Sequence, residues 1–376
     1  MYDLVVKGGT VVDPSQGLHA PRDVALEMGK VVAVEEDIDP THAREVVKAD
    51  GLLVTPGLVD IHVHVYWGVS HYGVEPDLGC LAKGVTTAVD AGSAGADTFP
   101  GLRRYVIKVA STRLYAFLNI SSMGMITDVV GELNDLRFAD PALAVRVARA
   151  KEDVIVGIKV RLDRDRVGDN GPIKPLRLAR QAADKLNLPI MIHIGRMDAP
   201  LAEILSYLRE GDLVTHTYHG HEGGILDDRG KLIGEARQAR ERGVLFDVGH
   251  GAGSFAFRVA QRALDQGFTP GTISSDLHVY NINGPVFDLA TTMSKFMHLG
   301  LSLDEVVDLC TWSPARAVGI PESIGTLKPS AEGDVALFRL EEGEFEFVDC
   351  EGETVLGERR LVAVNVIRGG EIYSRG

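Results

Sequence analysis

The chain has 376 residues, of which 45% are hydrophobic and 24% are charged, and its formal net charge is −14. This composition is typical of a folded globular protein and excludes a disordered or fibrous chain. The acidic charge is spread along the sequence without a basic stripe, so neither nucleic acid nor an anionic membrane surface is expected as a partner.

The sequence also shows no sign of a membrane segment or a disulfide framework. No apolar stretch approaches the roughly 20 residues that a membrane helix needs, and the first residues lack the pattern of a secretory signal. Cys80, Cys310 and Cys350 are widely spaced and odd in number, which fits reduced thiols. We therefore expect a cytoplasmic protein.

Both ends of the chain read as short β-strands without a long helical period. The predicted strands are residues 2–7, 10–12, 23–28, 31–34 and 52–54, followed near the other end by 334–339, 344–348 and 363–368. We expect residues 1–55 together with 325–376 to form one small β-sandwich domain.

Residues 56–324 change to apolar, β-branched runs separated by amphipathic segments such as 175–188 and 201–209. This alternation is expected of βα units around a parallel sheet, and eight units predict a (β/α)8 TIM-type barrel. In such a barrel the active site lies at the carboxyl ends of the strands. The eight predicted strands are 58–65, 85–90, 114–120, 154–161, 189–194, 213–217, 244–248 and 272–276.

Two histidines, His62 and His64, close the first predicted barrel strand. Residues two apart in a strand share one face, so both rings can reach one metal ion. The pair alone fits buried, hydrogen-bonded core histidines equally well. Further polar residues close later predicted strands, which favours a metal site: Lys159, His193, His216 and Asp276.

Imidazole nitrogen and carboxylate oxygen are ligands that suit zinc and related divalent ions. An ammonium at Lys159 beside two dications would be repelled, and its unpaired burial would be costly. Addition of carbon dioxide makes a carbamate, N6-carboxylysine, whose two oxygens can bridge two metals. The alternative is that Lys159 is a neutral general base or pairs with a nearby carboxylate.

The chain resembles the amidohydrolase superfamily through residues 56–64, Pro-Gly-Leu-Val-Asp-Ile-His-Val-His, the lysine of strand four, the later histidines and Asp276. The resemblance extends over nearly the whole sequence and includes the return strand around 324–336. It implies two divalent metal ions, with zinc expected. It places His62, His64 and Asp276 on the buried metal, His193 and His216 on the exposed one, and carboxylated Lys159 between them.

Such a centre predicts hydrolysis by a metal-bridging hydroxide. Asp276 is the expected catalytic acid and base, with a purely structural ligand as the alternative. Arg161 shares the inward face with Lys159, so it is a candidate to hold a substrate carboxylate, unless it pairs with Asp163 or Asp165. The other candidates for substrate binding follow predicted strand ends, and some are expected to be bystanders: Tyr66, His219, His250 and His278, with His221 less favoured.

Tyr66 stands where dihydroorotases of this superfamily usually have an arginine that holds the substrate carboxylate, which argues against dihydroorotase activity. The segments 216–220 and 275–278 are similar to the deacetylase branch. That similarity implies cleavage of an amide or ester acyl bond in a small carboxylate-bearing molecule, by a homo-oligomer. The alternatives are a cyclic amidohydrolase of the dihydroorotase or hydantoinase type and a non-catalytic scaffold.

Overall fold

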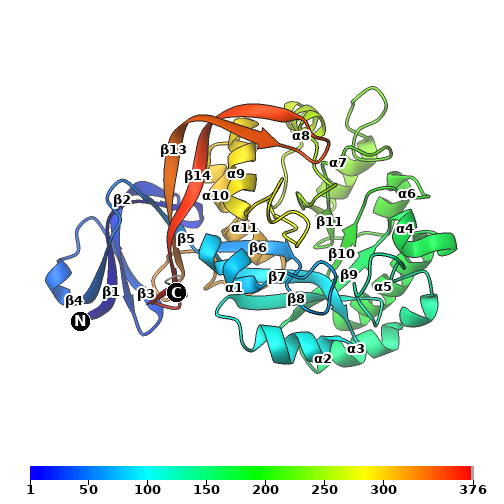
Figure 1. The fold of residues 1–376 in the computed structure, drawn as a ribbon, viewed down its shortest axis with the longest axis horizontal. Coiled ribbons are helices and arrows are strands. Elements are labelled where there is room, and N and C mark those ends of the chain that lie inside the picture. Colours follow the sequence, from blue (N-terminus) through cyan, green and yellow to red (C-terminus); the bar gives the residue numbers. More distant parts are fainter. Residues whose placement is uncertain (374–376) are drawn as a thin grey trace.

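The computed structural model describes residues 1–373 and contains two β-sheets, one of which is built from both ends of the chain (Figure 1). In this first sheet the strand order is β15-β14-β13-β5-β1-β2-β3, and β4 pairs in parallel with β1. Its strands are β1 (Tyr2–Asp13), β2 (Leu18–Glu27), β3 (Lys30–Glu35), β4 (Ala43–Lys48), β5 (Leu53–Pro56), β13 (Val335–Val348), β14 (Thr354–Arg368) and β15 (Glu371–Ile372).

Strands β5 and β13 join the two ends of the chain, since Val54 pairs with Leu337 in the antiparallel register. Alternate residues such as Val24 and Ile367 are buried in one apolar cluster, which holds the N-terminal and C-terminal strands together. A separate sheet made from both termini is therefore confirmed. The division into a domain of 1–55 with 325–376 and a domain of 56–324 stays a prediction.

Several strands of this sheet are longer than the sequence predicts. Residues 2–7 and 10–12 form the single strand β1, with a register shift between Val6 and Gly9 where Gly8 has a φ of +83°. Residues 334–339 and 344–348 likewise merge into β13, which pairs with β14 over most of its length. The sequence misses these joins because bulges interrupt the alternation of apolar and polar residues.

The second sheet is parallel and curled, with the order β12-β11-β10-β9-β8-β7-β6. Its two edges are linked by residues 272–277, through the parallel bridges Asp247–Thr272 and Val63–Leu277. The predicted (β/α)8 barrel is thus confirmed, with an extended segment in the eighth position. The seven strands are β6 (Leu58–Val63), β7 (Val85–Gly95), β8 (Arg113–Asn119), β9 (Ile155–Arg161), β10 (Ile190–His193), β11 (Leu213–Thr215) and β12 (Leu245–Phe246).

Residues 272–277 do not form a regular strand because some of their backbone N–H groups bind side chains. The N–H of Ser275 donates to Asp60 Oδ1 at 3.2 Å, and the N–H of Leu277 donates to the hydroxyl of Ser275 at 3.1 Å. Asp276 has a φ of +49°, which is outside the strand region. This local backbone turns the Asp276 side chain into the mouth of the barrel.

Helices cover the outside of the barrel (Figure 1). The predicted helix 175–188 is α5, which buries Leu176, Ala179 and Ala183 on one face and ends at Asn187 in the left-handed conformation. Among residues 1–373, none of the helices has the length and apolar character needed to span a bilayer. The helices are α1 (Pro76–Gly79), α2 (Phe99–Leu102), α3 (Pro141–Arg149), α4 (Arg164–Val167), α5 (Ile173–Leu186), α6 (Leu201–Ser206), α7 (Gly234–Glu241), α8 (Phe257–Asp265), α9 (Leu289–His298), α10 (Leu303–Asp308) and α11 (Trp312–Ala317).

The long hairpin of β13 and β14 leaves the first sheet and reaches over the barrel, where it lies beside α9 (Figure 1). Leu361 on β14 donates its backbone N–H to the hydroxyl of Ser294 on α9 at 2.9 Å. Phe347 and Leu361 are buried in the same apolar cluster as the barrel core. The C-terminal hairpin therefore packs against the barrel through α9.

Candidate metal centre

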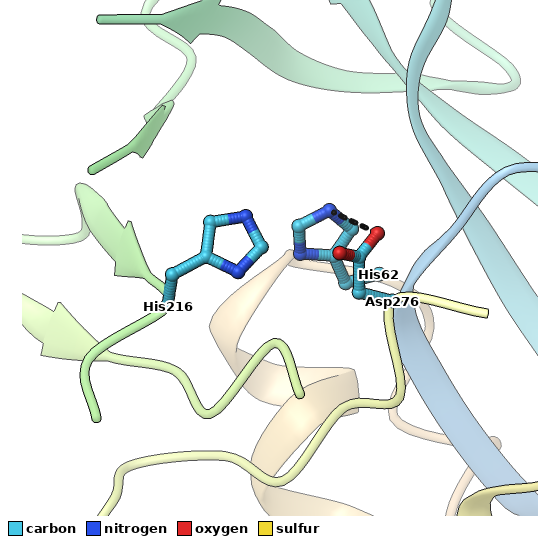
Figure 2. Close-up of side chains that lie close together, drawn as sticks. All are labelled: His62, His216 and Asp276. Carbon is cyan, nitrogen blue, oxygen red and sulfur yellow. Dashed lines mark ion pairs between the residues drawn. The ribbon is translucent and has the colours of Figure 1, made fainter. Parts of the chain in front are cut away.

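The ends of β6, β10 and β11 and the segment 272–277 bring the predicted ligands together. His62 Nε2 and His64 Nε2 lie 3.3 and 3.1 Å from Asp276 Oδ1. Figure 2 shows the ring of His216 facing His62 and Asp276 across the site, and one ligand atom from each of these three residues lies within 4.8 Å of the other two. All three are buried, so donor atoms of the kind that divalent metals prefer lie close together here.

Hydrogen bonds fix the tautomers of two of these rings. The Thr215 hydroxyl donates to Asp247 at 2.7 Å and therefore accepts a proton from His62 Nδ1 at 2.8 Å. His216 Nδ1 donates to the carbonyl oxygen of Gly249 at 2.6 Å. Each ring is left with an unprotonated Nε2, and His216 Nε2 is buried without a hydrogen-bond partner among the described residues.

Electrostatics in the site also fit a bound cation. Burial lowers the pKa of His62 and His216 well below the ordinary value, and lowers that of His64 to about 3, so the rings stay neutral. Burial raises the pKa of Asp276 to about 6. Imidazole lone pairs that face a carboxylate repel it unless a cation lies between them, and this arrangement is the one that metal sites use.

Lys159, on β9, is completely buried beside this group. Its Nζ lies 3.4 Å from His62 Nε2 and 3.3 Å from the sulfur of Met191, which are weak partners for an ammonium. Burial lowers its pKa to about 7. Gly92 lies against the base of this side chain, since a Cβ there would be 2.7 Å from the Lys159 Cβ, so the lysine fits only beside a glycine.

His193, at the end of β10, completes the group of histidines, with its ring centre 4.2 Å from that of His216. Its Nε2 donates to Asp163 Oδ2 at 2.8 Å, which leaves Nδ1 as the atom available to a metal. Burial raises the pKa of Asp163, and that carboxylate holds the imidazole in one orientation.

A cavity of about 370 Å³ is lined by five of the six predicted ligands, all except His216. Arg161 reaches it from β9, but Nε and Nη2 bind the carboxylate of Glu132 at 2.6 and 2.7 Å. The predicted alternative pairing with Asp163 or Asp165 is therefore wrong, because the loop after β8 supplies the partner. The remaining nitrogen, Nη1, lies 3.4 Å from the hydroxyl of Tyr72.

Tyr72 lines the cavity next to Arg161. Its ring stacks on His64 with centres 5.1 Å apart, and the ring of His278 packs against its edge at 4.8 Å. His278, one of the predicted candidates for substrate binding, also lines the cavity. Its Nδ1 accepts a hydrogen bond from the backbone N–H of Tyr280 at 3.2 Å. A larger groove of about 690 Å³ along β14 includes none of the predicted site residues.

The other three candidates for substrate binding do not line the cavity. Tyr66 donates its hydroxyl proton to the carbonyl of Thr98 at 3.0 Å. His250 accepts a hydrogen bond from Lys295 at 2.7 Å. His219 is buried, burial lowers its pKa to about 4, and its two ring nitrogens have no hydrogen-bond partner in residues 1–373. His221 lines the cavity instead.

Sequence reasoning missed several residues that shape this site. Tyr72 and Glu132 come from long loops whose course the sequence does not reveal. Arg166 lines the cavity and donates to Asp128 at 2.7 Å. Asp247 could have been recognised from the sequence, because an acidic residue inside the apolar run 244–248 requires buried hydrogen-bond donors around it.

Known proteins resemble the chain over its whole length. A profile of the amidohydrolase family matches residues 53–372. A protein named deacetylase from Enterococcus faecalis is 36% identical over 375 residues, which cover 99% of each chain. Two crystal structures superpose closely. One, described as an adenine deaminase, has a TM-score of 0.93 at 35% identity and covers 100% of both chains. The other, described as a dihydroorotase, has a TM-score of 0.92 at 32% identity and covers 99% of this chain and 97% of its own.

Proposed function

Because this chain belongs to the amidohydrolase family, we propose that it is a hydrolase that removes an acyl group from a small carboxylate-bearing amide or ester. The observation that carries the proposal is the buried group of His62, His216 and Asp276 beside Lys159, of which His62, Asp276 and Lys159 line one cavity. The similarity to a protein named deacetylase favours acyl transfer to water over other reactions of the family.

We assign His62, His64 and Asp276 to one divalent ion, His193 and His216 to a second, and Lys159 to both. When bound, the two ions supply Lewis-acid chemistry, which includes activation of water near neutral pH. Zinc is the expected metal, since imidazole and carboxylate ligands suit it.

Lys159 enters this assignment as N6-carboxylysine. A lysine whose pKa is about 7 is partly neutral at physiological pH, and a neutral amine attacks carbon dioxide. A new N–C bond forms, one proton leaves the nitrogen to solvent, and the side chain becomes an anionic carbamate. The change replaces a poorly solvated ammonium by a group with two oxygen ligands.

Asp276 is the proposed catalytic acid and base. It lines the cavity, and its Oδ1 lies 3.3 and 3.1 Å from His62 Nε2 and His64 Nε2, so its carboxylate stands beside both the proposed ligands and the substrate space. From there it can accept the proton that attacking water releases and return it to the leaving group. The backbone of Gly251 lies against Asp276, where a Cβ would be 2.5 Å from Oδ2, so the carboxylate is held close to the loop.

Arg161 and Tyr72 are the proposed contacts for the substrate carboxylate. Glu132 occupies two of the guanidinium nitrogens, which leaves Nη1 and the Tyr72 hydroxyl facing one another at 3.4 Å. A carboxylate that accepts from both groups would be oriented with its acyl end toward the ligands. Tyr72→Phe keeps the ring on His64 but removes this donor, so KM should rise by up to about tenfold with little change in kcat.

A screen of substrate classes tests the proposal. The purified protein is assayed for its metal content and for hydrolysis of N-acetyl amino acids, O-acetyl hydroxy acids, hydantoins, dihydroorotate and adenine. We expect about two divalent ions per chain and a dominant rate on an acetylated carboxylate. Fewer than about one ion without any hydrolysis would favour a non-catalytic scaffold and refute the proposal.

The second candidate is a cyclic amidohydrolase, which the 0.92 TM-score with a structure described as a dihydroorotase favours. A dominant rate on dihydroorotate or a hydantoin would select it and would leave the proposed metal ligands unchanged. The homo-oligomeric state, cytoplasmic location and domain division given above stay predictions. Light scattering tests the first of these directly.

A further inference from the structure

A second buried lysine, Lys295 on α9, has no part in the proposed chemistry. It is completely buried, and its Nζ donates three hydrogen bonds, to His250 Nε2 at 2.7 Å, the Pro285 carbonyl at 2.9 Å and the Val348 carbonyl at 2.7 Å. Burial lowers its pKa to about 8. An ammonium kept in such a place needs all of its protons bound, and here they connect three separate segments of the chain.

The hydrogen bond from Lys295 fixes the ring of His250. His250 Nδ1 donates to the carbonyl of Gly251 at 3.0 Å, so Nε2 is the unprotonated nitrogen that accepts from the ammonium. The ring also stacks on Phe255, with centres 4.5 Å apart. Tautomer and orientation of His250 are therefore both set from outside the catalytic cavity.

The backbone on either side of His250 supports two proposed metal ligands. The Gly249 carbonyl accepts the proton of His216 Nδ1 at 2.6 Å. The Gly251 backbone lies against the Asp276 carboxylate and donates to the Ser275 carbonyl at 3.1 Å. Both glycines have left-handed φ values, +49° and +59°. A displacement of this three-residue loop would move His216 and Asp276 together.

The far end of the β13–β14 hairpin holds the same loop. Val348 supplies a carbonyl to Lys295. The backbone N–H of Cys350 donates to the Phe255 carbonyl at 3.0 Å, and its thiol lies 3.4 Å from the Gly251 carbonyl. The hairpin and Lys295 thus converge on residues 249–251 from the outside.

We propose that Lys295 is a positioning residue that, through His250, ties the C-terminal hairpin to the loop 249–251 and so sets the placement of Asp276 and His216. This inference deepens the proposed function, because it adds a support outside the cavity for the same site. It makes the hairpin part of the active-site structure, although none of its residues contacts the ligands directly.

Substitutions at His250 test the link. His250→Leu removes the acceptor of Lys295, whereas His250→Gln keeps an oxygen or nitrogen close to the position of Nε2. The control is Ser294→Ala, which removes the bond between α9 and Leu361 beside Lys295 but does not touch His250. Each variant is loaded with cobalt(II), whose absorption spectrum reports ligand geometry, and is assayed for kcat and KM.

We expect His250→Leu to shift the cobalt spectrum and to lower kcat by about 10–100-fold with a smaller change in KM, as loss of ligand support does elsewhere. His250→Gln should restore most of kcat, and Ser294→Ala should leave spectrum and kcat as in the parent. If His250→Leu does not fold, the shorter His250→Asn, which cannot reach Lys295, takes its place.

A spectrum and kcat that match the parent in the Leu or Asn variant, with only a lower unfolding temperature, would overturn the inference. Equal losses in the Leu and Gln variants would also overturn it. If the parent hydrolyses none of the substrates, the proposed function fails, but the cobalt spectrum still decides whether Lys295 and His250 position the ligands.

Discussion

The hydroxyl of Thr215 offers the sharpest test of how His62 is prepared for a metal. It accepts the proton of His62 Nδ1 and donates its own to Asp247. Thr215→Val keeps the shape of the side chain and removes both bonds. Two buried polar groups then lose a partner, at about 1–3 kcal/mol each. Loss of such support typically weakens metal affinity by about 10–100-fold, equivalent to about 1.4–2.7 kcal/mol.

Thr272→Val is the matched control. Thr272 is equally buried and also donates to Asp247 at 2.7 Å, but the structure gives it no bond to His62. Zinc affinity is measured by competition with a coloured chelator, and stability by urea unfolding of the metal-free chains. Both variants should lose stability, while only Thr215→Val should lose zinc affinity. Equal zinc affinities in the two variants would refute the assigned tautomer and its role.

Three further predictions concern other buried groups. Lys159→Ala should bind less metal, and its activity should fall by more than about 100-fold and recover in part when acetate is added. A variant with two bound metals and full activity without acetate would exclude the carbamate. Glu132→Gln should leave the buried charge of Arg161 without a counter-charge and lower the free energy of unfolding by about 3–5 kcal/mol, as measured by urea titration. The control is Asp153→Asn, which breaks the exposed pair with Arg103 and should lower the free energy of unfolding by less than about 1 kcal/mol. His219 has a folded pKa of about 4 against an ordinary 6.5, so the unfolded chain takes up this proton first, and the stability that His219 contributes above pH 6.5 is lost as the pH falls toward 4. Other buried histidines add to the same slope, so His219→Gln should reduce the loss of stability by about 3 kcal/mol without abolishing it, as measured by urea unfolding at several pH values.

The parts of the site that lie on strands could be predicted from the sequence. Strand ends of a parallel barrel meet at one mouth, so the positions of His62, Lys159 and His216 along their strands were enough to place them together. The period of apolar residues also located α5 to within two residues. These features depend on local pattern and on one general rule of the fold.

The contacts on the substrate side could not be predicted, because they depend on loops and on residues far apart in the chain. Glu132 lies 29 positions from Arg161, and Lys295 lies 45 positions from His250. A histidine after a strand end has the same local sequence whether it faces the cavity, as His278 does, or turns outward. Only the packed structure separates these cases, since burial and partner choice are tertiary properties.

The pairing of β5 with β13 has a consequence for synthesis of the chain on the ribosome. Val54 pairs with Leu337, so roughly 280 residues must be added after β5 before its partner strand exists. At typical rates of about 5–20 residues per second, this takes about 15–60 s. During that interval one edge of β5 has open N–H and C=O groups, which are a template for wrong pairing. The nascent N-terminal strands are therefore the part of this protein for which protection by a chaperone would matter most.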